Sequence, residues 1–146
     1  MYAIREKIET VLNKGQDVSL LFLRLVLAYG FYGPATTKWS DIGAVATWFG
    51  EDLGIPFPLL NAYLAASTEM AGVVLLVLGL GVRLIALPMM VVMVVAITTV
   101  HLANGFSSGD NGFEIPLYYF LMLFILATHG GGVLGMDYFL KNNKNH

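Results

Sequence analysis

The sequence predicts an all-α integral membrane protein, a bundle of four transmembrane helices with short interfacial helices. Its 146 residues are 57% hydrophobic and 12% charged, whereas an ordinary soluble domain has about 25% charged residues. Four apolar runs approach or exceed the ~20 residues that a helix needs to cross a bilayer. Charged residues gather mainly between these runs, so one compact membrane domain accounts for most of the chain.

The first 17 residues differ from the rest of the chain, because they mix charged and apolar residues. Residues 2–14 place Ile4, Ile8, Val11 and Leu12 on one helical stripe, and Gly15 favours a helix end. We therefore expect a cytoplasmic amphipathic helix over residues 1–17, lying on the membrane surface. The alternative is a poorly ordered terminus. The segment does not resemble a cleaved signal peptide, since charged residues crowd it and it lacks a short apolar core with a small-residue cleavage site.

The membrane domain is expected over residues 18–136, and its first span over 18–38. Arg24 lies inside this span, and Pro34 predicts a kink because proline cannot donate to the helical hydrogen-bond ladder. Asp41 is a favourable N-cap residue. It predicts a short interfacial helix over residues 42–52.

The second span, residues 59–82, contains an acid near its middle. A carboxylate at this depth costs ~2.5–3.5 kcal/mol on insertion scales, so it normally faces a partner inside the protein. Small residues share its helical face, which predicts a tight helix–helix seam. The residues of this face are Ala62, Ala65, Glu69, Gly72, Leu76 and Gly79.

The last two spans are expected over residues 84–103 and 115–135. A loop rich in Gly, Ser, Asn and Asp joins them over residues 104–114. Residues 137–146 form a polar C-terminal tail.

Four spans place both termini on the same side of the membrane. Lysine and arginine concentrate on that side, and Lys38 is the single basic residue near the other. The positive-inside rule therefore predicts that both termini are cytoplasmic. The basic residues of the cytoplasmic side are Arg5, Lys7, Lys14, Arg83, Lys141 and Lys144.

Ionisable residues on different spans define a candidate site at two depths. Lys38, His101 and Glu114 end three spans on the outer side, while Arg24 and His129 lie in the inner half. Glu69 lies between the two levels. The structural interpretation is an ion pair between Glu69 and Arg24 that ties two spans together.

The functional interpretation makes the same pair the floor of a cavity that binds a polar headgroup, such as the carbonyl groups of a quinone. In that case Glu69, Arg24 and His101 are candidate catalytic residues, with His101 as a hydrogen-bond donor or proton carrier. The candidate ligand-binding residues are Lys38, Glu114, Tyr118 and His129. The structural alternatives are a salt bridge between Lys38 and Glu114 at the rim, and ordinary hydrogen bonds for the two histidines.

Several functions are excluded by composition. The chain has no cysteine, so it cannot itself carry out thiol–disulfide chemistry, bind thiolate-ligated clusters or attach haem covalently. No metal-ligand spacing is present, and a net charge of −2 indicates no nucleic-acid partner.

Five segments, taken in order, resemble the DoxX family of small four-span membrane proteins. They are LFLRLVLAYGFYGPATTKW (21–39), LGIPFP (53–58), AASTEMAGVVLLVLGLGVR (65–83), NGFEIP (111–116) and HGGGVLGMDYFL (129–140). The resemblance covers about residues 18–140. By position, the residues that match the family's charged pattern are Arg24, Lys38, Glu69, Arg83 and Glu114.

The resemblance implies a four-helix membrane fold and a link to membrane redox chemistry. Some members are subunits of thiosulfate:quinone oxidoreductase, and others act in oxidant defence with soluble partners. We therefore expect a quinone-binding or redox-associated subunit of the bacterial or archaeal cytoplasmic membrane, with no covalently bound cofactor. The alternatives are a non-catalytic anchor or assembly subunit and a small transporter. Homo-oligomers and membrane or soluble protein partners stay open.

Overall fold

The computed structural model describes residues 2–143, and this part of the chain is helical without any strand. The α-helices are α1 (Tyr2–Ser40), α2 (Ile42–Thr47), α3 (Pro58–Leu78), α4 (Val82–Ala96), α5 (Glu114–His129) and α6 (Met136–Asn142). Two π-helical segments, η1 (Trp48–Asp52) and η2 (Ile97–His101), extend α2 and α4, and two 3₁₀ turns, η3 (Leu102–Asn104) and η4 (Ser108–Asp110), come next. The predicted polar tail includes residues 144–146, which lie outside the described residues.

The longest element, α1, is continuous from Tyr2 to Ser40. The predicted helix end at Gly15 is therefore wrong. A glycine inside a helix costs only about 1 kcal/mol relative to alanine, and the regular helix on both sides of Gly15 outweighs that cost. The helix also continues through Pro34, which lies inside the predicted span of 18–38.

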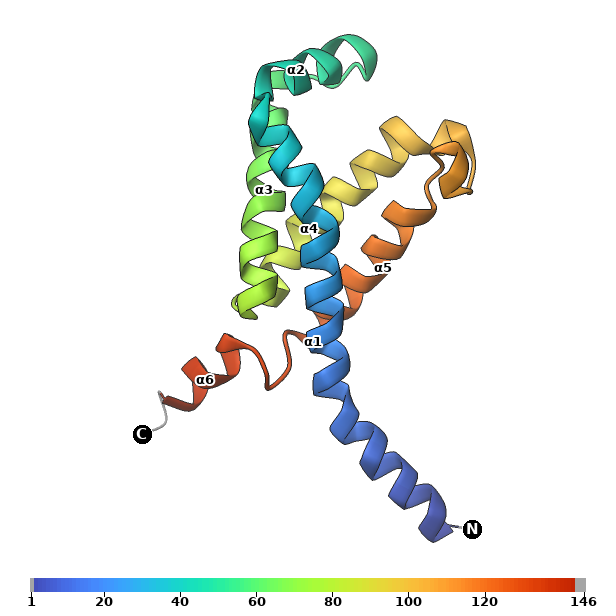
Figure 1. Ribbon diagram of the computed structural model, residues 1–146, viewed down its shortest axis with the longest axis vertical. Coiled ribbons are helices and arrows are strands. Elements are labelled where there is room, and N and C mark those ends of the chain that lie inside the picture. Colours follow the sequence, from blue (N-terminus) through green and yellow to red (C-terminus); the bar gives the residue numbers. More distant parts are fainter. Residues whose placement is uncertain (1, 144–146) are drawn as a thin grey trace.

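A short helix caps the far end of α1. Asp41 has an extended φ of −149°, and its side chain accepts a hydrogen bond of 3.0 Å from the Ala44 N–H. The predicted N-cap is thus confirmed, and α2 with η1 covers the predicted range of 42–52. Figure 1 shows α2 lying across the ends of α1 and α3.

The bundle consists of two helix pairs. α1 packs mainly against α3, and α4 packs mainly against α5. The pairs meet at the end away from α2 and diverge toward the α2 end (Figure 1). Glycines permit two of the close approaches, because a Cβ on Gly30 would collide with the Tyr119 ring and one on Gly72 with the Met89 side chain.

The buried face of α3 is the one that the sequence predicts, except that Ala66 is buried and the predicted Ala65 is half-buried. Its buried residues are Ala62, Ala66, Glu69, Gly72 and Leu76. The opposite face carries exposed apolar residues such as Val74 and Val77. This distribution suits a helix with lipid on one side and protein on the other.

Three helical segments within the described residues are long and apolar enough to cross a membrane. They are Ile4–Ser40, Pro58–Leu78 and Val82–Asn104. α5 is apolar but has 16 residues, slightly below the usual range of about 17–25. The structure thus shows an all-helical protein with three candidate spans and one shorter apolar helix.

Candidate ligand cavity

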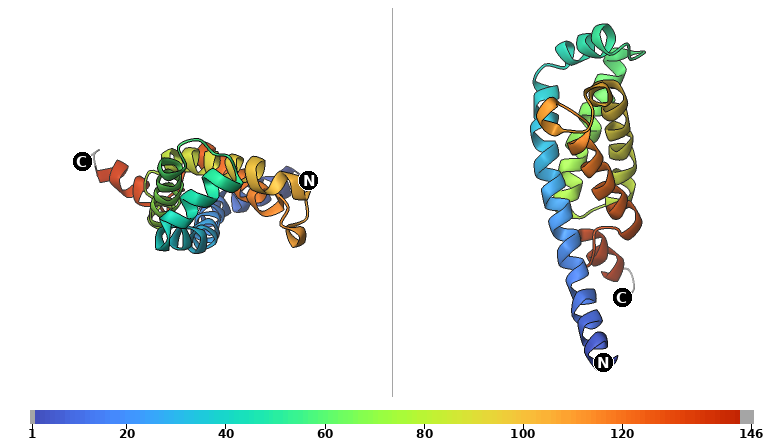
Figure 2. Two further views of the ribbon diagram at one scale, coloured as in Figure 1. Left: turned by 90° about the horizontal axis from the view of Figure 1, so that it is seen from above. Right: turned by 90° about the vertical axis from the view of Figure 1, so that its right-hand side faces the viewer.

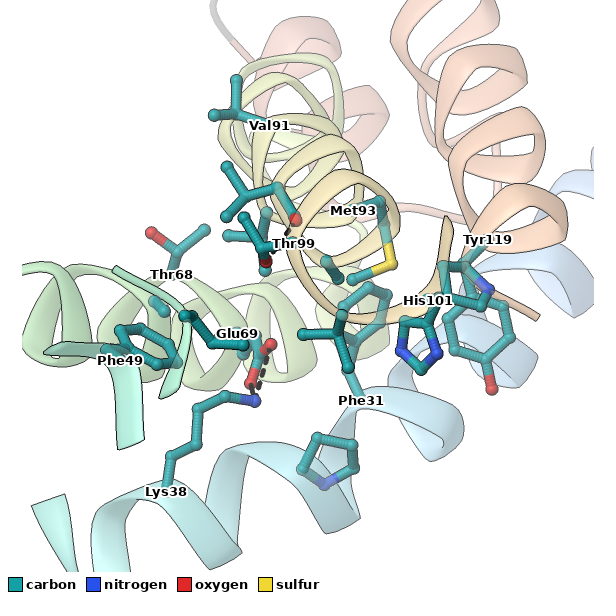
Figure 3. Close-up of a pocket in the computed structure, with 18 of the residues that line it drawn as sticks. Phe31, Lys38, Phe49, Thr68, Glu69, Val91, Met93, Thr99, His101 and Tyr119 are labelled. Carbon is teal, nitrogen blue, oxygen red and sulfur yellow. Dashed lines mark hydrogen bonds and ion pairs between the residues drawn. The ribbon is translucent and has the colours of Figure 1, made fainter. Parts of the chain in front are cut away.

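A cavity of about 720 Å³ lies between the two diverging helix pairs. This volume falls within the ~300–1,000 Å³ range of small-molecule sites. Its walls are mostly apolar, with Phe31 from α1, Phe49 from η1 and Met93 from α4 among the lining residues. Figure 3 shows these side chains around the polar groups Lys38, Glu69 and His101.

The strongest polar feature of the cavity is an ion pair between α1 and α3. Lys38 Nζ lies 2.8 Å from Glu69 Oε2 and 3.1 Å from Oε1. The Glu69 side chain is 3% exposed and that of Lys38 is 19% exposed. The carboxylate is therefore enclosed by protein, while the Lys38 side chain, which lines the cavity, is partly exposed.

The local sequence explains why this pair forms. The small neighbours Ala62 and Ala66 on the buried face of α3 let α1 approach closely enough for Lys38 to reach the carboxylate. Trp39 fixes the approach, because its Nε1–H donates a 3.1 Å hydrogen bond to the Ala66 carbonyl.

The predicted pairing of Glu69 with Arg24 is wrong. Fourteen residues separate Arg24 from Lys38 on α1, a rise of about 21 Å. Glu69 lies level with Lys38, whereas Arg24 lies level with Leu76 and Val77, further along α3. Because Lys38 pairs with Glu69, the interpretation of Lys38 and Glu114 as a rim salt bridge is also wrong.

His101, at the end of η2, occupies another wall of the cavity. Its Nδ1 lies 2.8 Å from the backbone carbonyl oxygen of Asn111. The same carbonyl accepts a 3.1 Å hydrogen bond from Asn104 Nδ2. Since a carbonyl oxygen can only accept, Nδ1 of His101 must carry the hydrogen, and the neutral ring keeps the Nε2 lone pair.

The contact between His101 Nδ1 and the Asn111 carbonyl gives a direct prediction. In ¹⁵N NMR of protein labelled at histidine, we expect neutral His101 to show a protonated Nδ1 and an unprotonated Nε2. His129 is a useful internal comparison, because its Nδ1 also contacts a backbone carbonyl, that of Ile125 in its own helix, at 3.1 Å. A neutral His101 ring protonated at Nε2 would contradict the contact with Asn111.

Arg24 lies away from the cavity, in a junction of helix ends. It is fully buried, and its guanidinium donates to the carbonyls of Leu76 (3.0 Å), Val77 (3.4 Å) and Leu134 (3.1 Å). The first two carbonyls belong to the last turn of α3, where a cation is favoured by the helix dipole. Arg24 thus ties α1, α3 and the segment before α6 together.

The sequence does not mark the remaining residues of this junction as a group. Asp137 accepts from the N–H groups of Gly81 (2.9 Å) and Val82 (3.4 Å) at the start of α4. Arg83 donates to the His129 carbonyl at the end of α5 (3.2 Å), and Asp17 accepts from the Val133 N–H (2.9 Å). These four contacts, with those of Arg24, satisfy backbone groups at the ends of α3, α4 and α5 and in the loop before α6.

The other predicted site residues also lie outside the cavity lining. Glu114 accepts from the Ser108 N–H (3.0 Å) and the Tyr118 hydroxyl (3.2 Å), and so organises the loop before α5. His129 bonds locally to Thr128 and Ile125 near the end of α5. The structure therefore brings together Lys38, Glu69 and His101, and separates them from Arg24, Glu114, Tyr118 and His129.

Much of the cavity wall consists of residues that were not predicted from the sequence. Thr68 and Thr99 supply hydroxyl groups, and Phe31, Phe49 and Tyr119 supply aromatic surface. Thr68 was detectable in principle, because it precedes Glu69 on the same helix. The aromatic residues carry no separate signal, since apolar residues also face lipid throughout this chain.

Fold and cavity together define a small helical membrane protein with a mostly apolar internal site and one enclosed ion pair. The family model described as DoxX matches residues 19–102. The chain therefore belongs to the DoxX family, a family of membrane proteins.

Similar proteins carry little functional description. An uncharacterised protein of Haemophilus influenzae is 34% identical, over 87% of this chain and 86% of its own length. A second uncharacterised protein of that organism is 33% identical, over 86% of this chain and 93% of its own. A putative oxidoreductase CatD of Bacillus subtilis is 30% identical, over 92% of this chain and 96% of its own. No solved structure matches the chain.

Proposed function

We propose that this protein is a quinone-binding subunit of a membrane oxidoreductase system, with the quinone headgroup seated between Lys38, Glu69 and His101. The observation that carries the proposal is an ion pair enclosed at the wall of an apolar cavity of about 720 Å³. The similarity to a putative oxidoreductase supports the redox setting.

The chemistry of the cavity suits a neutral amphipathic ring better than an ion. Lys38 and Glu69 neutralise one another, so an ionic headgroup would have to displace one partner of the pair. A quinone carbonyl can accept from the Lys38 ammonium without breaking that pair, because an ammonium has three donors. A quinol hydroxyl can donate to Nε2 of His101. The remaining apolar and aromatic walls suit the ring and the first part of its tail.

We propose that α5 is the fourth span and that both termini are cytoplasmic, in a bacterial or archaeal cytoplasmic membrane. Glu114 and the polar loop before it would start this span in the outer interface. The distribution of Lys and Arg supports the orientation. The cavity, whose lining includes Trp48, Phe49 and Leu53 next to α2, would then open on the outer side of the membrane.

A matched pair of substitutions on α3 tests the site. Ala65 lines the cavity, whereas Ala71 is exposed on the same helix. We expect Ala65→Phe to weaken binding of a short-chain ubiquinone or menaquinone analogue at least about tenfold, or ~1.4 kcal/mol, by occupying the cavity. Ala71→Phe should leave the affinity unchanged. Titration of purified protein in nanodiscs measures both.

The second candidate function is a non-catalytic assembly subunit, and the junction around Arg24 favours it. Seven hydrogen bonds between charged side chains and backbone groups there hold helix ends and the segment between α5 and α6 together. Under this alternative the purified protein would bind neither quinone analogue, and Ala65→Phe would change only its stability or the yield of its complexes.

A further inference from the structure

One face of α1 is apolar along most of its length and points away from the bundle. The core-facing side chains of α1, such as Leu20, Leu27 and Phe31, are buried. At 100° per residue, the opposite side carries a series with alternating spacings of four and three residues. One half of this series is Ile4, Val11, Val18, Leu25 and Tyr32, and the other is Ile8, Gly15, Phe22 and Tyr29. We call these nine positions the α1 stripe.

The α1 stripe is exposed in a single copy of the chain. The fractional exposure is 67% at Ile4, 68% at Val11, 61% at Phe22 and 85% at Tyr29. Lipid can cover the part that lies in the membrane, from about Val18 onward. It cannot readily cover Ile4, which lies in the N-terminal part of α1 that projects beyond the bundle (Figure 1).

α1 is one continuous helix, and this determines where its N-terminal part lies. A membrane-surface helix would need a bend near Gly15, yet α1 passes through Gly15 as one helix. The first turns therefore extend in line with the span into water. An apolar stripe that continues there, beside Arg5 and Glu9 on the other faces, is stabilised by a protein partner that excludes water from it.

The spacing of the stripe indicates what kind of partner covers it. A helix face that contacts lipid needs no fixed period, and an α-helix of 3.6 residues per turn drifts about 20° per heptad from a seven-residue repeat. The α1 stripe keeps that repeat from Ile4 to Tyr32, with an apolar or aromatic side chain at eight of its nine positions and Gly15 at the ninth. A sustained repeat of this kind is the pattern of two helices that supercoil about one another.

A second copy of the same helix would cover the α1 stripe both within the membrane and beyond it. In a parallel pair each stripe position meets its own counterpart, and Gly15 allows close approach near the boundary. Lys7 would lie beside Leu12 of the other copy, an arrangement that brings no like charges together. Figure 2 shows α1 along one edge of the bundle, so its outer side is accessible to a second copy.

We propose that two copies of the chain associate in parallel through the α1 stripe, as a coiled coil that runs from the membrane into the cytoplasmic N-terminal segment. This dimer does not depend on quinone binding, because the cavity lies on the opposite side of α1. It would place two cavities in one complex.

Cysteine cross-linking tests the proposal, since the natural chain has no cysteine. Val11→Cys and Val18→Cys place a thiol on the stripe. Asn13→Cys and Gln16→Cys place one at neighbouring exposed positions on the other side of α1. A disulfide requires Cβ atoms about 3.5–4.5 Å apart. Mild oxidation in membranes should therefore give covalent dimers for the first pair and monomers for the second. Equal cross-linking at all four positions, or at none, would overturn the proposal.

The mass of the purified full-length protein provides a second measurement. Ile8→Asp combined with Val11→Asp should halve the protein mass found by light scattering in detergent, with the helix content unchanged, because both residues lie beyond the bundle. A monomeric natural chain would overturn the proposal. So would a spin label at Val11 that is accessible to lipid-dissolved oxygen, which would place the segment on the membrane surface, and so would a stripe covered by a different protein.

Discussion

Replacing Lys38 with methionine should lower the free energy of unfolding by about 3 kcal/mol, the low end of the cost of breaking a buried ion pair. The substitution leaves the Glu69 carboxylate, 3% exposed, without its cation. Glu69→Gln should cost less, because the half-buried Lys38 at the end of α1 can turn its ammonium group toward water. Thermal unfolding in a fixed detergent measures both variants.

The double variant distinguishes an ion pair from two independent effects. Lys38→Met with Glu69→Gln removes both charges, so its cost should be well below the sum of the single costs. Lys141→Met, an exposed position on α6, is the control and should stay within about 0.5 kcal/mol of the natural chain. Additive costs would show that Lys38 and Glu69 do not stabilise one another in the membrane.

The comparison of Glu69 with Arg24 shows what the sequence could and could not predict. An acid in the middle of an apolar run, flanked by small residues, had to face the protein interior, and it does. Which basic residue pairs with Glu69 depends on how far α1 and α3 are shifted along one another. This shift results from how α1 and α3 pack, which pairs Glu69 with Lys38 and leaves Arg24 at the end of α3.

Local signals predicted local structure well and long-range contacts poorly. Asp41 was recognisable as an N-cap because the N–H that it binds is three residues away. Asp137 performs the same task for α4, but it is 56 residues from Gly81, one of the two residues whose N–H it binds. Nothing near Val82 in the sequence could reveal it. The cavity has the same origin, since its walls come from α1, η1, α3, α4 and α5 together.

The prediction that a helix ends at Gly15 is wrong for a different reason. Glycine ends a helix readily when the chain must turn, but a central glycine costs only about 1 kcal/mol relative to alanine. No tertiary contact requires a turn at Gly15, where even a Cβ would meet open space. The periodicity of residues 2–14 therefore predicts a helix correctly, and the expectation that this helix is separate from the first span is wrong.

Two glycines in the link between α3 and α4 should differ sharply when each is replaced by alanine. Gly79 and Gly81 both have a positive φ, of 68° and 58°. Alanine in this conformation costs about 1–2 kcal/mol at either position. At Gly79, however, the new Cβ would collide with the Arg24 guanidinium and lie 2.5 Å from the Gly135 Cα, whereas at Gly81 nothing lies within 4 Å.

We therefore expect Gly81→Ala to lower the free energy of unfolding by the backbone cost alone, and Gly79→Ala by about 2 kcal/mol more, as for an overpacked core position. The extra cost arises because Gly135 presents backbone, which cannot rotate away, and because Arg24 must give up its carbonyl contacts. Unfolding of the two variants in the same detergent measures the difference. Equal destabilisation would mean that the segment before α6 moves aside freely, and that Arg24 does not fix the junction as the structure indicates.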